Sequence, residues 1–187
     1  MGIFDEPLVF VDIETTGLSA ARGRVVEVAA IRVEKGEIRQ TFNKLINPET
    51  ELPFFITNLT GITNNDVRHA PTFTTIASEL HDIMNSAIFV AHNVRFDYSF
   101  LKAEFNRLGA TFDPRLLCTV RLSRALYPEH KGHKLADLIE RHGFQYQSRH
   151  RAYDDAHVLW QFMQHVHTEF TAESLGIAFN KQLKPSC

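Results

Sequence analysis

The hydrophobic positions of the chain change their spacing several times, and each change marks a new expected element. Short apolar or alternating runs predict strands, whereas apolar residues three and four apart predict helices. The expected strands cover residues 8–13, 25–33, 38–46, 87–93 and 114–120. The expected helices cover residues 73–84, 95–108, 119–127, 134–142 and 151–171. Strands first, followed by alternating helices and strands, predict an α/β domain around a mixed sheet.

Two segments lack a clear period. Residues 53–70 carry proline, asparagine and glycine at short intervals, which predicts a loop with short helical turns. Thr72 is a suitable N-cap for the helix that follows. The last residues, "NKQLKPSC", show no hydrophobic repeat. We therefore expect one folded domain over residues 1–172 and a C-terminal tail or linker over residues 173–187.

Composition and charge narrow the class of protein. The chain has 187 residues, enough for one domain with a full core, with 44% hydrophobic and 22% charged residues. A net charge of −2 gives no overall attraction to nucleic acid, which argues against a histone-like protein but not against a site made locally positive by metal. Two cysteines form no disulfide framework, and Cys118 is expected to be a small buried residue. Because no segment resembles a membrane span or a signal peptide, a cytoplasmic protein is expected.

The stretch "FVDIETTG" places Asp12 and Glu14 at the end of an apolar strand. Residues two apart on a strand project from the same face of the sheet, so the two carboxylates are expected side by side. If that face is exposed to solvent, the pair is only the polar end of a strand. A functional interpretation requires other acids that point to the same place.

Asp97 and Asp155 each lie in the first turn of an expected helix, above an apolar stripe. Asp97 shares its stripe with Leu101 and Leu108, and Asp155 shares its own with apolar residues four, seven and eleven positions later. An acid in the first turn also complements the helix dipole, which explains its place along the helix but not its choice of the apolar face. Asp154 points elsewhere and is expected to be a surface charge.

The four acids are expected to meet in the interior or at the floor of a cleft, where burial without cations is strongly unfavourable. Oxygen ligands in that number favour Mg²⁺ or Mn²⁺ over zinc, and two such ions about 3.5–4 Å apart clamp the attacking and leaving oxygens of a phosphodiester. We therefore interpret Asp12 and Glu14 as metal ligands. His150 lies five residues before Asp155. An unperturbed pKa of about 6.5 suits a histidine to accept a proton from water, and an ordinary surface histidine is the alternative.

Together these residues resemble the DEDDh family of 3′–5′ exonucleases, which includes the proofreading subunit epsilon of bacterial DNA polymerase III. "VDIETTG" is similar to the first family motif, "TGIT" and "AHNVRFDYSFL" to the region up to the second, and "HRAYDDA" to the third. The resemblance extends over roughly residues 7–170. It implies a ribonuclease-H-like fold with a central mixed sheet flanked by helices, two divalent metal ions, and release of nucleoside 5′-monophosphates from a 3′ end. Residues 1–172 would then be the exonuclease domain.

The resemblance also implies roles for individual residues. Asp12, Glu14, Asp97 and Asp155 would be the ligands of the Mg²⁺ or Mn²⁺ ions, and His150 would be the general base. The residues that would contact the terminal nucleotide are Thr15, Thr16, Leu18, Ile62, His92, Asn93 and Phe96. The candidates for phosphate contacts, which are otherwise ordinary surface charges, are Arg22, Arg24, Lys131, Lys134 and Arg151.

The expected substrate is the 3′ end of a single-stranded or frayed strand, with DNA favoured and RNA trimming, as in an oligoribonuclease or a tRNA-processing relative, as the alternative. The segment "CTVRLSRALYPEHKGHKLADLIERHG" resembles bacterial chains that join this exonuclease to an excinuclease-like GIY-YIG endonuclease. A DNA polymerase or an associated endonuclease is thus the expected protein partner. A non-catalytic docking module predicts the loss of a ligand or of the histidine, and the sequence retains them all. A metal-dependent phosphatase would leave the nucleotide-pocket residues without a purpose.

Overall fold

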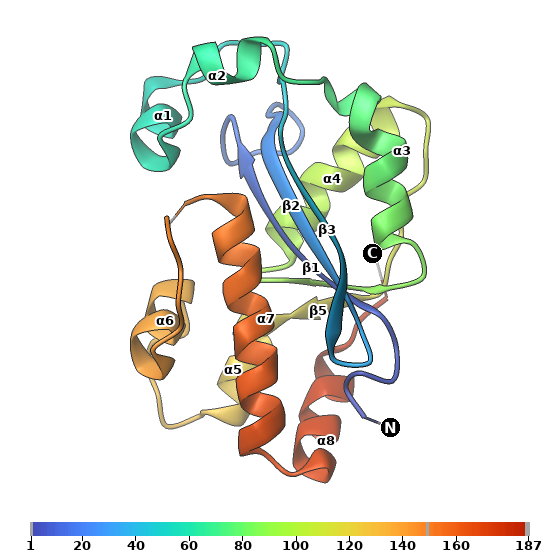
Figure 1. Cartoon of the computed structure of the whole chain (residues 1–187), viewed down its shortest axis with the longest axis vertical. Helices are drawn as coiled ribbons and strands as arrows, with labels where there is room; N and C mark the ends of the chain where they lie inside the picture. The colour runs from blue at the N-terminus through green and yellow to red at the C-terminus, as the bar shows by residue number, and fades with distance from the viewer. Residues whose placement is uncertain (1, 149, 186–187) are drawn as a thin grey trace.

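A five-stranded sheet forms the centre of the computed structural model, which describes residues 2–148 and 150–185 (Figure 1). The strands follow the order β3–β2–β1–β4–β5 across the sheet. β2 runs antiparallel to β1 and β3, whereas β1, β4 and β5 run parallel to one another. The sheet is therefore mixed, as the sequence predicts. The strands are β1 (Leu8–Thr15), β2 (Val25–Glu34), β3 (Glu37–Leu45), β4 (Ile88–Ala91) and β5 (Leu116–Cys118).

Helices cover both faces of this sheet (Figure 1). They are α1 (Phe54–Thr60), α2 (Asn64–Arg68), α3 (Phe73–Met84), α4 (Arg95–Arg107), α5 (Thr119–Leu126), α6 (Leu135–His142), α7 (Ala152–Glu169) and α8 (Ala172–Gln182). α3 and α4 pack on the face that carries Val9 and Val11 of β1. α7, with α5, α6 and α8 around it, packs on the face that carries Leu8 and Phe10. Burial on both faces explains why β1 begins as a continuous apolar run and not as an alternating one.

The strands and helices expected from the sequence are present, with changes at their ends. The expected loop of residues 53–70 contains α1 and α2, and Cys118 is buried. Thr72 occupies the N-cap position of α3, but its side chain does not cap the helix and shares a hydrogen bond with the Thr75 hydroxyl instead. Leu108 lies at the C-cap of α4 and is 40% exposed, so the buried stripe of this helix ends before it.

The helix α8 is not predicted by the sequence pattern. Thr171 caps its first turn, and Leu175 and Phe179 are buried against the core that α7 shares with the sheet. The backbone of Lys184 then pairs with Leu116 of β5 through two hydrogen bonds, of 2.7 and 2.9 Å. The predicted boundary at residue 172 thus falls at the start of a helix that belongs to the same core, while its role as a domain boundary stays a prediction.

The described part of the chain contains no helix that is both long enough and apolar enough to cross a membrane.

Candidate active site

Asp12 and Glu14 alternate with buried residues along β1, and they lie on the side of the strand that also carries Leu8 and Phe10. Both carboxylates therefore project toward the face covered by α7. The shared face predicted from their spacing is present. β1 continues past the end of its parallel neighbour, because its pairing with β4 stops at Phe10 opposite Val90.

Asp97 lies beside this unpaired end of β1, in the first turn of α4. Its side chain is only 3% exposed, and its carboxylate accepts hydrogen bonds from the backbone N–H groups of Ile13 and of Asp97 itself. The bond to Ile13 takes the place of a missing ladder bond at the edge of β1. It also brings the start of α4 next to Asp12 and Glu14, although α4 packs on the opposite face of the sheet.

Asp155 and His150 approach the same place from α7. Asp155 is 6% exposed, and the residues four, seven and eleven positions after it are fully buried, as the sequence predicts. A metal-ligating atom from each of Glu14, His150 and Asp155 lies within 4.8 Å of the others. His150 precedes the helix with a φ of 59°, a left-handed conformation that is uncommon outside glycine and that clusters at functional sites.

The acids of this cluster raise one another's pKa values. Burial raises the pKa of Asp12 well above its ordinary value, and the charges of Asp97, Asp155, Glu14 and Glu27 raise it further. Burial also raises the pKa of Glu14 to about 8, together with Asp155, Glu27 and Asp97 and against the charge of Arg151. The pKa of Asp97 is raised by burial, although its backbone hydrogen bonds oppose the shift. Without a cation the cluster therefore retains protons near neutral pH.

This donor set fits hard divalent cations. Carboxylate oxygens are the ligands that Mg²⁺ and Mn²⁺ prefer, and a cation relieves the repulsion that raises the pKa values of Asp12 and Glu14. The residues that would hold the ions are Asp12, Glu14, Asp97 and Asp155, with the His150 ring beside two of them.

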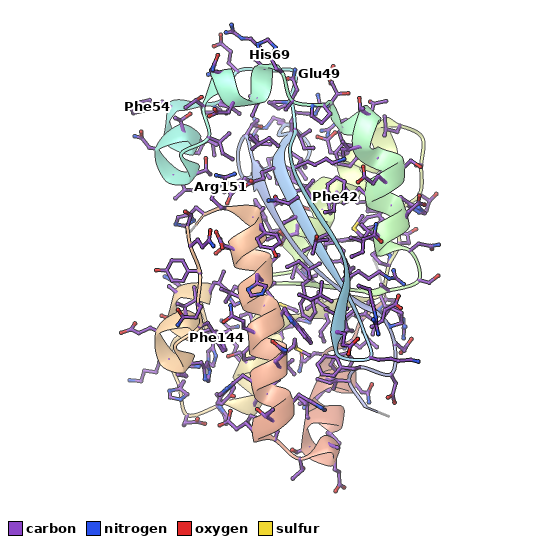
Figure 2. All side chains as sticks on the ribbon, in the orientation of Figure 1. Phe42, Glu49, Phe54, His69, Phe144 and Arg151 are labelled. Carbon is purple, nitrogen blue, oxygen red and sulfur yellow. The ribbon has the colours of Figure 1, made fainter. Side chains whose placement is uncertain are left out.

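Glu27 is a buried acid next to the cluster, and its role is not predicted from the sequence. It lies directly opposite Glu14 in the β1–β2 ladder and is only 1% exposed. Its carboxylate accepts hydrogen bonds from the Arg151 guanidinium at 2.8 and 3.2 Å and from the backbone N–H of Ala152 at 3.0 Å. Figure 2 shows Arg151 at the end of α7 that faces the strands. The available signal is an acid inside the otherwise apolar run "VVEVAAI".

Asp154 has a role other than the expected surface charge. Its two carboxylate oxygens accept hydrogen bonds from the backbone N–H groups of Gln147 and Ser148, at 3.2 and 3.0 Å. Asp154 therefore ties the chain before His150 to the first turn of α7. The sequence reveals its first-turn position but not the loop that folds back over it.

The residues expected at the terminal nucleotide form two groups. Thr15 and Thr16 begin the β1–β2 loop, where the Thr15 hydroxyl donates to the Gly17 carbonyl at 2.7 Å and Thr16 exchanges backbone and side-chain hydrogen bonds with Arg24 at 2.9 Å. This pinned loop presents Leu18, whose side chain is 88% exposed.

The second group follows β4 and α1. The Nδ1 atom of His92 lies 2.9 Å from the Thr119 hydroxyl, and burial lowers the pKa of His92 to about 4, so the ring is neutral at pH 7. Asn93 has a φ of 65° and is exposed, and Phe96 packs on Phe100. Ile62 is 3% exposed and packs in a small cluster with Val26, Leu52 and Val67, so little of its side chain faces outward.

Two of the arginines expected to contact phosphate are already paired with acids. Arg24 pairs with Glu104 at 2.9 Å and with Glu49 at 3.2 Å, and Arg151 pairs with Glu27. These arginines therefore join elements of the fold.

A cluster of acids and a histidine thus lies at the carboxyl ends of the parallel strands of a mixed sheet, and this donor set suits divalent cations. The family model RNase_T, described as an exonuclease, matches residues 9–163. Because this match covers most of the chain, the chain belongs to this exonuclease family. The resemblance seen in the three motifs and the expected enzyme class, an exonuclease, are confirmed.

Curated relatives are much longer than this chain. The 3′–5′ exonuclease DinG of Bacillus subtilis (strain 168) is 40% identical over 152 residues, which are 80% of this chain and 16% of that protein. A PolC-type DNA polymerase III of Clostridium perfringens (strain 13 / Type A) is 35% identical over 179 residues, which are 95% of this chain and 12% of that protein. The chain thus spans less than a fifth of the length of either relative.

Solved structures confirm the expected ribonuclease-H-like fold. Exonuclease X, in complex with a 5′-overhanging duplex DNA, superposes with a TM-score of 0.69 at 25% identity and covers 92% of this chain and 99% of its own. E. coli Exonuclease I, in complex with a dA16 oligonucleotide, superposes with a TM-score of 0.80 at 20% identity and covers 92% of this chain and 42% of its own.

Proposed function

We propose that this domain is a metal-dependent 3′–5′ exonuclease that hydrolyses the phosphodiester bonds of single-stranded or frayed nucleic acid, preferentially DNA, and releases nucleoside 5′-monophosphates. The observation that carries the proposal is the meeting of four inward acids and His150 at the end of β1, from one strand and two helix starts. Relatives named as a 3′–5′ exonuclease and as DNA polymerases support the direction and the preference for DNA.

Asp12, Glu14, Asp97 and Asp155 would hold two divalent ions, Mg²⁺ or Mn²⁺, which supply charge neutralisation and activation of water for phosphodiester hydrolysis. His150 is the general base, and a ring nitrogen accepts the proton of the attacking water. Its position follows from the two contacts that flank it, Asp154 with the preceding loop and Glu27 with Arg151. Both contacts position the His150 ring near the acids, and neither of them involves the ring itself.

The 3′ end of the nucleic-acid strand is bound through its shape and by stacking of its terminal base, and the base edges are not read. Leu18 projects from a loop whose backbone is fixed by Thr15 and Thr16, so its exposed side chain is positioned to contact a terminal base. His92, Asn93 and Phe96 follow β4, which neighbours β1 on the side away from β2. They therefore approach Asp12 of β1 from the side opposite to the β1–β2 loop that carries Leu18. The protein partner we propose is a DNA polymerase or an endonuclease.

The test is a degradation assay with a 5′-labelled single-stranded DNA and the matched RNA, each with Mn²⁺ or with EDTA. We expect a ladder that shortens from the 3′ end, is abolished by EDTA and by Asp155→Ala, and grows faster with DNA. A faster reaction on RNA would replace DNA with RNA as the substrate. If well-folded protein with Mn²⁺ shortens neither strand, the exonuclease proposal is wrong and a docking module remains.

A further inference from the structure

A pocket of about 370 Å³ opens beside the start of α4, and none of the roles assigned so far accounts for it. Three separate segments line it: Asn93 and Arg95 at the start of α4, Cys118 and Arg121 at the junction of β5 and α5, and Lys184 after α8. The sequence gives no signal for this pocket, because its walls are far apart in the chain and one of them follows the unpredicted helix α8.

The pocket is electropositive. Arg95, Arg121 and Lys184 are all exposed, and no acid lines the pocket among the described residues. Within the same described part of the chain, none of these three side chains takes part in a hydrogen bond or an ion pair, unlike the side chains of Arg24, Arg32, Arg39, Arg107, Arg115 and Arg151, which pair with acids. Three cations that converge without a counter-charge repel one another, and a bound anion would relieve that repulsion.

A second pocket has a different charge pattern. It encloses about 430 Å³ at the opposite end of β4 and β5, and its walls mix His81, Asp113 and Arg115, the last of which is paired with Glu6. Its charges are therefore of both signs, and they offer no selective attraction for an anion.

The basic pocket is preformed, and it shares the start of α4 with the acid cluster. Lys184 is held by the two backbone hydrogen bonds to Leu116, and α8 is anchored by buried Leu175 and Phe179. Arg95 begins the helix whose first turn carries Asp97, and Asn93 belongs both to the pocket wall and to the expected nucleotide contacts. The start of α4 therefore borders both the pocket and the acid cluster.

We propose that Arg95, Arg121 and Lys184 bind the backbone phosphates of the nucleic-acid strand that leads to the 3′ end in the acid cluster, an inference that rests on the proposed exonuclease function. Arginine presents donors in a fork that matches phosphate oxygens, and lysine adds a point charge. The pocket thus contributes affinity for long substrates and none for a single nucleotide.

The test compares charge reversals inside and outside the pocket. Arg121→Glu and Lys184→Glu lie inside it, whereas Arg124→Glu on the same helix α5 and Lys181→Glu on α8 are matched controls outside it. Binding of a fluorescent single-stranded DNA of about 12 nucleotides is measured by anisotropy in an Asp155→Ala background, where the strand is not cut. Hydrolysis of thymidine 5′-monophosphate p-nitrophenyl ester, which is too short to reach the pocket, is measured in the parent background.

We expect each pocket reversal to weaken oligonucleotide binding about tenfold and to lower the slope of log affinity against log salt by about 0.7 per lost contact. The two controls should change affinity less than about twofold, and hydrolysis of the ester should stay within about twofold of the parent for all four variants. Equal effects inside and outside the pocket would overturn the phosphate site. If the parent does not hydrolyse the ester although the pocket reversals weaken binding, the exonuclease function fails while the phosphate contacts remain; if the Asp155→Ala protein binds no strand, the phosphate site fails.

Discussion

Two groups of inward-facing acids lie in this fold, and their neighbours differ. Glu27 and Glu104 are almost fully buried, and each is paired with arginine. Asp12, Glu14, Asp97 and Asp155 face other acids instead, and burial raises the pKa of the first three. An acid that meets arginine joins two elements, whereas acids that face one another are the donor set that the proposed cations require.

The contrast is sharpest at Glu14 and Glu27, which lie opposite each other on neighbouring strands. Glu27 accepts hydrogen bonds from the Arg151 guanidinium and from the first backbone N–H of α7, so a cation partner is supplied by the protein itself. Glu14 instead has its carboxylate within 4.8 Å of metal-ligating atoms of Asp155 and His150. Two directly opposite residues of the β1–β2 ladder thus differ in role: Glu27 contacts the start of α7, whereas Glu14 belongs to the proposed metal site.

The largest expected effect comes from exchanging one acid of each group for its amide. Asp155→Asn should lower kcat/KM about 10³-fold or more, because a lost metal contact removes several kcal/mol of transition-state stabilisation. Its melting temperature in EDTA should hold or rise, since one repelling charge is gone. Activity on a 5′-labelled DNA and thermal melting in EDTA give the two measurements.

Glu104→Gln is the matched control for this comparison. It should lower the free energy of unfolding by about 1–3 kcal/mol, the usual value of a hydrogen bond to a charged group, and leave kcat/KM within about twofold. If Asp155→Asn instead destabilises the protein in EDTA while Glu104→Gln does not, the division between the two groups of acids is wrong.

A smaller loss of activity is expected for Glu27→Gln, which weakens the pair with Arg151. The free energy of unfolding should fall by about 1–3 kcal/mol. Unlike Glu104→Gln, this variant should also lower kcat/KM about tenfold. The start of α7 would shift, and His150 and Asp155 would move away from their positions beside Asp12 and Glu14. Both variants are assayed well below their melting temperatures. Equal kcat/KM values for the two would remove the positioning role of Glu27.

The sequence predicts the acid cluster better than its supports. Asp12, Glu14, Asp97 and Asp155 could be found because each breaks an apolar pattern within its own element, which is local information. Glu27 also breaks an apolar run, but its partner Arg151 is 124 residues away and is brought to it only by tertiary packing. The role of Asp154 depends on the loop at Gln147, which folds back over the first turn of α7. α8 escaped prediction for a related reason: Gly176 lowers its helix propensity, and buried Leu175 and Phe179 compensate only in the folded protein.

A moderate effect on thermal stability is expected from metal and pH together. In EDTA, the raised pKa of Glu14 means that its stabilising contribution is full below its ordinary value of 4.5 and is lost as the pH rises through about 8. Mg²⁺ replaces the proton, so the rise in melting temperature on adding Mg²⁺ should be larger at about pH 8.5 than at about pH 6. At 100 times the dissociation constant the ion adds about 2.7 kcal/mol, or roughly 5–10 °C for a domain of this size.

Differential scanning fluorimetry at both pH values checks this expectation, with Glu14→Gln as the control. That variant lacks the titrating carboxyl, so its melting temperature in EDTA should fall less between the two pH values. An equal rise with Mg²⁺ at both pH values in the parent would show that the ion binds without displacing protons from the cluster.

The smallest expected effect is that of Asp154→Ala, because Asp154 only helps to position His150 and is not a proposed metal ligand. The variant releases the backbone N–H groups of Gln147 and Ser148, both in an exposed loop, so the free energy of unfolding should fall by only about 0.5–1.5 kcal/mol. Hydrogen exchange should quicken at these two amides and remain slow in β1, and kcat/KM should fall about two- to fivefold, since His150 keeps its second anchor through Glu27 and Arg151. The double variant Asp154→Ala/Glu27→Gln then measures whether the anchors act together. A loss greater than the product of the two single losses means that each anchor holds His150 when the other is removed, whereas a loss equal to the product means that they position different parts of the site.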